Sequence, residues 1–287
     1  MIKAPIKYFG GKGTMLNKLF KYFPEPSSYN IFVDAYAGSA VVALNIDAEI
    51  KIINDLDDNV YSLFNTIAHE DSFAKFKRLC EISLYNERSC REYKRSLRED
   101  ELPEWLRAYR FWYVNRSSHN GIGGFSINTV VRRRMSKSTS DFLSSVEGLQ
   151  ELHEALSSCI VTSRNALDCI RFWDRKNVFI YCDPPYHQST RTSARYNVDA
   201  DNDHHEQLVE VLNNLQHAQV ALSGYDCELY QKRLKLNKYE FEVNTTTGNH
   251  EPKTKVECIW TNFKKTDSIP TSLDPSCTPI KFVIRQI

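Results

Sequence analysis

The sequence predicts an α/β fold in which a mostly parallel sheet is covered by helices and interrupted by an inserted helical module. Three observations lead to this prediction. Short apolar or alternating runs typical of strands recur along the chain, and helical patterns lie between most of them. One long block carries helical patterns only. Strands and helices in alternation favour a parallel sheet with helices on both faces.

The strand-like runs are short and mostly apolar, as expected for buried strands. They lie at 31–33, 50–53, 160–162, 178–181, 220–222, 239–243 and 256–260, with a last one at 282–284. The helical patterns between them lie at 14–22, 39–47 and 204–215. The last of these helices begins with Asp203 and Glu206 at the spacing of a capping box.

The block from about 57 to 158 breaks this alternation. Helices are expected there at 61–67, 72–82, 87–97, 104–115 and 138–158, with a glycine-rich loop at 119–124. A helical block of this size exceeds a normal crossover between strands. We therefore predict a catalytic and cofactor domain from 1–58 and 159–287, and an inserted helical domain from 59–158.

Composition indicates an ordinary globular protein. The chain has 287 residues, a formal net charge of +1 and 41% hydrophobic residues. No apolar run approaches the roughly 20 residues needed to cross a bilayer, and the N-terminus lacks the apolar region of a signal peptide. The eight cysteines are scattered without a CxxC pair, which argues against structural zinc and for a reducing compartment. We expect a cytoplasmic protein with no membrane contact and no metal.

Positive charge is concentrated in the middle of the chain. From Arg107 to Lys137 there is no Asp or Glu, and aromatic residues are interleaved with the basic ones. The basic residues are Arg107, Arg110, Arg116, Arg132, Arg133, Arg134 and Lys137. Such a combination suits a surface that follows phosphates and contacts bases. A solvated charged face is the alternative interpretation.

The tetrapeptide Asp183-Pro184-Pro185-Tyr186 directly follows the apolar run at 178–181. Two prolines cannot continue a ladder of backbone donors, so a buried strand should end there. Ligands of open α/β sheets bind at such strand ends. The Asp183 carboxylate and the Pro184 carbonyl could both accept hydrogen bonds from an aromatic amine, while Tyr186 stacks on its ring. A surface turn with a helix-capping Asp is the alternative.

A second motif predicts a cofactor site. The segment at 32–40 reads as a strand, the acid Asp34, a tight turn at Gly38 and then a helix, although the full GxGxxG spacing is absent. Asp55 ends the next strand, where an acid commonly binds ribose hydroxyls, or else caps a helix. The glycines at 10–13 invite a phosphate-loop interpretation, but Ile6 and Gly13 occupy positions where that motif needs Gly and Ser or Thr.

Together these residues resemble the Dam-type family of DNA adenine-N6 methyltransferases, D12 class. The resemblance covers nearly the whole chain. It comprises the Lys-aromatic-x-Gly-Gly-Lys segment at 7–12, the cofactor turn at 32–38, Asp55, a helical recognition module, the tetrapeptide at 183–186 and a late strand at 220–225. The order of cofactor motif, recognition module and catalytic motif matches the family's α arrangement.

The resemblance implies a Rossmann-like sheet that binds S-adenosylmethionine, and site-specific methylation of a flipped adenine in duplex DNA. Residues that match the family's catalytic motif are Asp183, Pro184 and Tyr186. Residues that match its cofactor contacts are Tyr8, Lys12, Asp34, Gly38, Asp55, Asn165 and Asp183. Asn165 stands where the family usually has an acid beside the cofactor adenine. We expect Arg116 near the glycine loop to read bases, Asn120 to contact DNA, and Arg132, Arg133, Arg134 and Lys137 to hold phosphates.

Some positions depart from the family pattern. Ala40 replaces a common glycine of the cofactor turn, and Gly224-Tyr225 stand where the Dam enzymes have Asn-His. The loop at 123–126 does not match their recognition hairpin, so the target sequence stays open. Two alternative functions also stay open, an RNA adenine-N6 methyltransferase and a catalytically inactive DNA-binding subunit. We expect a monomer, with a cognate restriction nuclease open as a partner.

Overall fold

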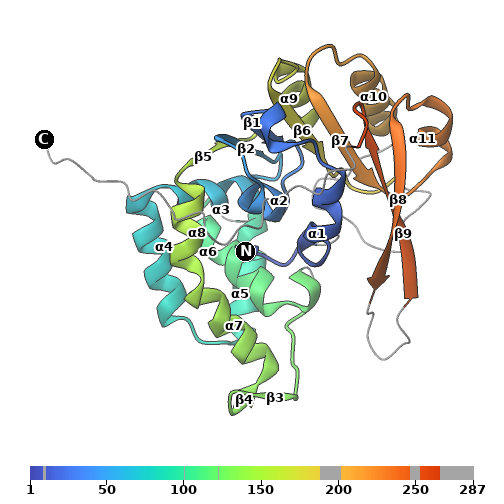
Figure 1. Cartoon of the computed structure of the whole chain (residues 1–287). Helices are drawn as coiled ribbons and strands as arrows, with labels where there is room; N and C mark the ends of the chain where they lie inside the picture. The colour runs from blue at the N-terminus through green and yellow to red at the C-terminus, as the bar shows by residue number, and fades with distance from the viewer. Residues whose placement is uncertain (9–10, 100, 122, 188–201, 246–252, 266–287) are drawn as a thin grey trace, which may run out of the picture.

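A mixed seven-stranded sheet forms the centre of the molecule (Figure 1). The computed structural model describes residues 1–8, 11–99, 101–121, 123–187, 202–245 and 253–265. The strands of the sheet follow the order β5-β2-β1-β6-β7-β9-β8. They are β1 Ile31–Asp34, β2 Ile50–Asn54, β5 Cys159–Thr162, β6 Val178–Cys182, β7 Gln219–Gly224, β8 Asn237–Thr245 and β9 Lys253–Thr261.

The sheet is mostly parallel, as predicted. Strands β5, β2, β1, β6 and β7 pair in parallel, whereas β9 is antiparallel to both β7 and β8. Only a short connection separates β8 from β9 in the sequence, too short for the crossover that parallel strands need. The seven strand-like runs before position 261 are confirmed as strands. The run at 282–284 lies outside the described residues.

Short helices connect the strands of the sheet. They are α2 Val41–Asn45, α9 Ala166–Phe172, α10 Asn202–Asn213 and α11 Glu228–Arg233. The helix expected at 14–22 is instead divided into η1 Lys12–Thr14, α1 Leu16–Leu19 and η2 Phe20–Tyr22, followed by η3 Pro26–Ser28. The helix expected at 39–47 is shortened because Ala40 has left-handed φ and Ile46 is extended.

The segment between β2 and β5 is a cluster of helices beside the sheet (Figure 1). Its elements are α3 Asp58–Ala68, α4 Glu70–Ile82, α5 Glu87–Glu99, α6 Glu104–Ser117, η4 His119–Gly121, the strands β3 Val131–Arg132 and β4 Met135–Ser136, α7 Lys137–Glu147 and α8 Leu149–Leu156. Helix α6 is central, because it contacts α3, α4, α5 and α7. The single helix expected at 138–158 is divided at Gly148.

Strand β6 is buried on both faces of the sheet. Phe179 and Tyr181 belong to the core that extends to α2, α3 and the helical cluster, whereas Val178, Ile180 and Cys182 belong to the core under α9, α10 and α11. Successive side chains of a strand point to opposite faces, so two cores fix this strand. The residue that follows it, Asp183, is therefore held at a defined point. Within the described residues, no helix is long and apolar enough to cross a membrane.

Candidate active site

The ends of three neighbouring strands meet at one edge of the sheet. Asp34 is the last residue of β1, Asp183 follows β6, and Ser223 and Gly224 end β7. Because β1, β6 and β7 are parallel and adjacent, their carboxyl ends lie together. The predicted catalytic acid is thus placed next to the predicted cofactor strand, as ligand binding in an α/β sheet requires.

Lys12 and Asp183 form a buried ion pair at this edge. The Lys12 Nζ lies 2.6 Å from Asp183 Oδ1, and the lysine side chain is 2% exposed. Burial alone would lower the pKa of Lys12, but the carboxylate of Asp183 raises it well above its ordinary value. Asp183 retains 20% exposure, so the acid is held from inside and reachable from outside.

A second donor fixes the same oxygen of Asp183. Ser223 Oγ donates to Asp183 Oδ1 at 2.8 Å, and Ser223 Oγ also lies 2.7 Å from the Tyr181 hydroxyl. Both donors bind Oδ1, and no described residue donates a hydrogen bond to Oδ2, so Oδ2 can accept one from a ligand. No described residue donates a hydrogen bond to the Pro184 carbonyl oxygen. Two acceptors at this strand end suit a planar NH2 group.

The ring of Tyr186 lies beside this ion pair. Its hydroxyl accepts a hydrogen bond from Lys12 Nζ at 3.3 Å and donates one to Glu257 Oε1 at 3.1 Å. The ring centroids of Tyr186 and Tyr225 are 4.5 Å apart. Lys12, predicted from the N-terminal segment, is thus brought together with Asp183 and Tyr186 of the tetrapeptide. Glu257, Ser223 and Tyr225 were not among the predicted site residues.

The turn after β1 has the features of a cofactor cradle. Gly38 has φ +51, and a Cβ atom at this position would lie 2.8 Å from the Tyr8 ring. The Gly38 N–H donates to Asp55 Oδ2 at 2.8 Å, and the Asp57 N–H donates to Asp55 Oδ1 at 2.9 Å. Tyr8, Gly38 and Asp55 are therefore neighbours. Burial raises the pKa of Asp55 to about 6, although both backbone donors lower it.

Asp34 supplies a second acid to this cradle. It is buried, and its Oδ1 has no hydrogen-bond partner among the described residues. Burial and then the charges of Asp183 and Asp55 raise the pKa of Asp34 well above its ordinary value. An unsatisfied buried acceptor is costly unless a ligand completes it. Together with Asp55, it fits a nucleoside-like ligand that carries an amino group.

Asn165 takes a different position from the other predicted cofactor residues. It caps helix α9, because its Oδ1 accepts from the Leu167 N–H at 2.9 Å. The amide oxygen expected to face a cofactor adenine is thus engaged by the backbone. Sequence reasoning did not assign Asn54, which is buried and bonds the carbonyl oxygens of both Ala35 and Arg164. Asn54 joins the end of β2 to the segments that follow β1 and β5.

Arg116 supports the N-terminal segment. Its guanidinium donates to the carbonyl oxygens of Ala4 and Pro5, and burial lowers its pKa to about 10. The neighbouring Asn115 bonds both the N–H and the carbonyl oxygen of Lys7, at 2.7 and 2.8 Å. These contacts attach the segment that carries Tyr8 and Lys12 to helix α6. The base-reading role expected for Arg116 gains no support from this geometry.

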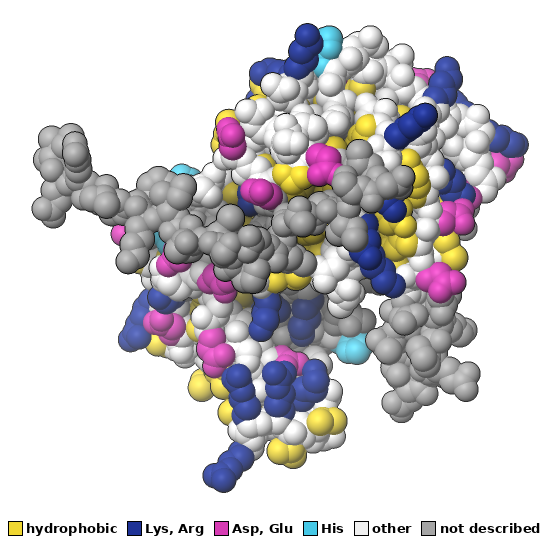
Figure 2. Space-filling model, viewed as in Figure 1, with side chains coloured by type: hydrophobic (Ala, Val, Ile, Leu, Met, Phe, Trp, Pro, Cys, Tyr) yellow, Lys and Arg dark blue, Asp and Glu magenta, His cyan; other side chains and the backbone are white. Residues whose placement is uncertain are grey.

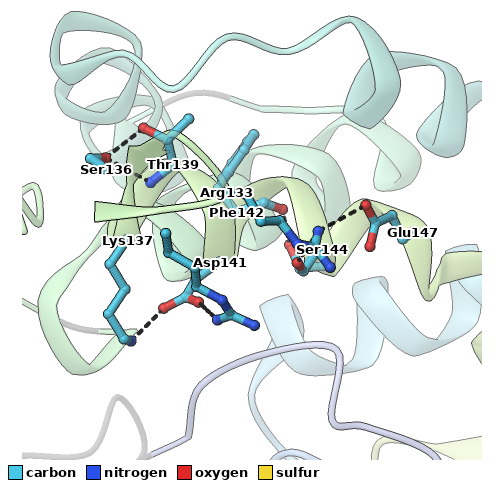
Figure 3. Close-up of polar contacts among 10 residues, drawn as sticks. Arg133, Ser136, Lys137, Thr139, Asp141, Phe142, Ser144 and Glu147 are labelled. Atoms are coloured by element: carbon cyan, nitrogen blue, oxygen red, sulfur yellow. Dashed lines mark hydrogen bonds and ion pairs between the residues drawn. The ribbon is translucent and has the colours of Figure 1, made fainter. Parts of the chain in front are cut away.

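The basic residues expected to hold phosphates lie on the β3–β4 hairpin and at the start of α7. Arg132 and Lys137 both pair with Asp141, at 2.6 and 2.8 Å, and Arg133 pairs with Glu147 at 3.3 Å (Figure 3). Arg134 is exposed. Figure 2 shows Lys and Arg side chains gathered over this end of the molecule. The side chain of Asn120 lies outside the described part of the structure.

Comparison with known proteins identifies relatives of the chain. Residues 8–248 match the family described as D12 class N6 adenine-specific DNA methyltransferase. Over 92% of the present chain, the sequence is 25% identical to modification methylase StsI of Streptococcus sanguinis. Over 64% of the present chain, it is 25% identical to type II methyltransferase M.FokI of Planomicrobium okeanokoites. It is 24% identical to the DNA adenine methylase of Escherichia coli strain K12 over 87% of its length.

The relatives differ in how much of their own length the chain covers. It spans 43% of the StsI methylase and 29% of M.FokI, but 92% of the Escherichia coli enzyme. The matched region includes the strand ends, the cofactor turn and the Asp183 to Tyr186 segment. The family match therefore covers Lys12, the cofactor turn and the Asp183 to Tyr186 segment, whereas Glu257 lies beyond it.

Proposed function

The chain belongs to the D12 class N6 adenine-specific DNA methyltransferase family, and we propose that it transfers a methyl group from S-adenosylmethionine to N6 of an adenine in duplex DNA. The observation that carries this proposal is the Asp183 carboxylate. One of its oxygens is fixed by Lys12 and Ser223, while the side chain remains partly exposed. A carboxylate held in this way can receive an amine without rearranging.

Adenine in a duplex must leave the base stack before its N6 can react. Extruding it costs a few kcal/mol. Stacking on an aromatic ring returns roughly 1–3 kcal/mol, and Tyr186 lies beside the ion pair for this role. Hydrogen bonds from N6 to Asp183 and to the Pro184 carbonyl would orient the amine. They favour a more pyramidal nitrogen, whose lone pair is a better nucleophile.

The cradle around Gly38 fits S-adenosylmethionine, which when bound supplies an electrophilic methyl group on a sulfonium sulfur. We propose that Asp55 accepts hydrogen bonds from the ribose hydroxyls and that Asp34 accepts one from the amino group. N6 would become positively charged as it bonds the methyl carbon and the carbon–sulfur bond breaks to leave a neutral thioether, and N6 would then lose one proton to solvent. The Asp183 carboxylate stabilises that charge electrostatically. Lys12 holds Asp183 in place, and its contact with the cofactor, expected from the sequence, stays a prediction.

For DNA binding, we propose the helical segment 59–158 as the target-recognition module, with the hairpin as its phosphate contact. Arg133 and Arg134 form the hairpin turn with φ of 52° and 60°. A non-glycine residue in the left-handed backbone region costs about 1–2 kcal/mol, so an Asn-Gly pair would form this turn with less strain. Arginines at a strained turn are consistent with a need for charge there. Their surface ion pairs are weak, at about 0–1 kcal/mol, so phosphates can replace the acidic partners.

An Asp183→Ala variant tests the activity. It should lose methyl transfer to duplex DNA while still binding DNA, and full activity would refute the proposal. Asp168→Ala is the control, because Asp168 is exposed and pairs with Arg171 on the same helix. Methyl transfer is measured with tritiated S-adenosylmethionine on duplex DNA and on RNA. Transfer to RNA alone would replace the proposed substrate.

A biological role follows from the relatives as part of the same proposal. The names of the StsI and FokI relatives support a modification enzyme that protects DNA against a cognate nuclease. We propose that the chain acts as a cytoplasmic monomer in this role. Long-read sequencing of DNA from cells that express it would reveal the methylated motif. Adenine methylation absent from that DNA would contradict the proposal.

A further inference from the structure

Glu257 is a buried carboxylate to which the proposed reaction assigns no role. Its side chain is 3% exposed, and the residues that follow it in β9, Cys258, Ile259 and Trp260, are buried and apolar. Burying an ionised carboxylate costs several kcal/mol unless the site compensates for it. An apolar residue would stabilise this strand more cheaply. The position therefore calls for a reason outside the packing of the strand.

The strand direction brings Glu257 to the active edge of the sheet. Strand β9 runs antiparallel to β7, and Gly224, the last residue of β7, pairs with Cys258. Glu257 thus lies one residue beyond the paired end of β7. It reaches the edge where Asp183 follows β6, although it comes from the opposite chain direction.

Both oxygens of Glu257 face residues of the site. Oε1 accepts the hydrogen bond of the Tyr186 hydroxyl at 3.1 Å, and Oε2 lies 4.0 Å from Lys12 Nζ. The Tyr186 hydroxyl also receives a hydrogen bond from Lys12. The hydroxyl is thus held between a cation and an anion, which restricts rotation of the ring toward the substrate.

Charge balance gives Glu257 a second effect. Lys12 at 2.6 Å would largely cancel the charge of Asp183 if the two formed an isolated pair. A second carboxylate within reach of Lys12 leaves the three groups with a net charge of −1. Methyl transfer to a neutral amine creates positive charge at N6, and a preorganised negative site stabilises that charge.

We propose that Glu257 is a positioning residue for methyl transfer, which fixes the Tyr186 hydroxyl and offsets Lys12 so that Asp183 keeps its negative charge toward the substrate amine. This inference rests on the proposed function. It concerns the rate of the chemical step, because Glu257 would act through its contacts with Tyr186 and Lys12.

The test compares Glu257→Gln with Glu240→Gln. Glu240 lies on the adjacent strand β8 and pairs with Lys238 at the surface, so its replacement removes the same charge away from the site. Glu257→Gln should lower kcat about tenfold, less than the roughly 100-fold or greater loss seen when a group that touches the developing charge is removed. KM for DNA, and the Kd for S-adenosylmethionine by calorimetry, should stay within about twofold, because binding groups are intact. Glu240→Gln should match the wild type.

A third variant separates the hydrogen bond from the fold. Tyr186→Phe keeps the ring and removes the hydroxyl, so its effect and that of Glu257→Gln should overlap, and the double variant should lose less than the product of the two single losses. If Glu257→Gln does not fold, Tyr186→Phe carries the test with a lowered kcat at an unchanged Tm.

Three outcomes distinguish the ideas. Suppose that the wild type is active and that kcat is unchanged in Glu257→Gln, or in Tyr186→Phe if Glu257→Gln does not fold. This result would leave the proposed function intact and overturn the role of Glu257. Raised KM and Kd at unchanged kcat would also overturn it, because that pattern indicates weakened binding. A wild type that methylates no adenine would instead refute the proposed function.

Discussion

Replacing Lys12 with Met removes the buried cation of the site while keeping a long unbranched side chain. Lys12 Nζ lies 2.6 Å from Asp183 Oδ1 and 4.0 Å from Glu257 Oε2, so the variant would leave these two carboxylates without their shared cation. Removing one partner of a buried ion pair costs about 3–5 kcal/mol, because the remaining charge stays buried. Water can still reach the partly exposed Asp183. We therefore expect a loss near the lower limit, about 3 kcal/mol.

This loss should be visible in thermal unfolding. For a chain of this size 1 kcal/mol shifts Tm by about 2 °C or slightly more, so Lys12→Met should unfold about 6 °C below the wild type. Lys232→Met is the control, because Lys232 is exposed and pairs with Glu228 at the surface, where a pair contributes about 0–1 kcal/mol. Differential scanning calorimetry at pH 7 measures both variants. Equal Tm values for the two variants would refute the buried pair.

The pH dependence adds a signed test of the same pair. Burial alone would lower the pKa of Lys12, but the carboxylates of Asp183 and Glu257 raise this pKa above its ordinary value of 10.5. Stability from a raised pKa is fully present below 10.5 and is lost as pH rises through the folded-state pKa. The Tm difference between wild type and Lys12→Met should be constant from about pH 7 to 10 and should narrow above that range. A difference that disappears already near pH 8 would contradict this assignment.

Three further predictions concern cofactor and DNA. Burial raises the pKa of Asp55 to about 6, so below that pH the side chain carries a proton and loses a hydrogen-bond acceptor. The Kd for S-adenosylmethionine should therefore rise between pH 7 and 5 in the wild type but not in Asp55→Asn. A wild-type Kd that does not change with pH would argue against ribose binding by Asp55. Alanine at 132–134 should reduce the slope of log Kd for DNA against log salt by about 0.9 for each phosphate that the variant no longer neutralises, and an unaltered slope would exclude phosphate binding by these arginines. Gly38→Ala should weaken cofactor binding because its Cβ meets the Tyr8 ring at 2.8 Å, whereas Gly148→Ala has free space; equal affinities in the two variants would show that the turn adapts.

The strands could be predicted because their signals are local. The apolar run of β6 followed by two prolines determines both the burial of the strand and its end. Asp183 could therefore be placed at a sheet edge from the sequence alone. The same reasoning located β1 and β2, whose last residues lie on the side of that edge where we propose the cofactor site.

Other features depend on distant contacts and could not be predicted. Glu257 resembles any polar residue of an alternating strand until the register of β9 with β7 places it beside Lys12. The β3–β4 hairpin has only two paired positions and lacks an Asn-Gly turn, so its local signal is absent. Arg116 carries the charge typical of a nucleic-acid contact, but no sign in the sequence indicated that it would bond the carbonyl oxygens of Ala4 and Pro5.

The net charge of +1 hides two groups of charged residues, one at the hairpin and one at the strand ends. At the hairpin, Arg132, Arg133, Arg134 and Lys137 outnumber their partners Asp141 and Glu147, so that surface can attract phosphates. At the strand ends two carboxylates surround one lysine, which disfavours phosphate and favours a group that becomes positive. The two groups of charges have opposite sign, as expected if the hairpin binds the DNA backbone and Asp183 receives a base.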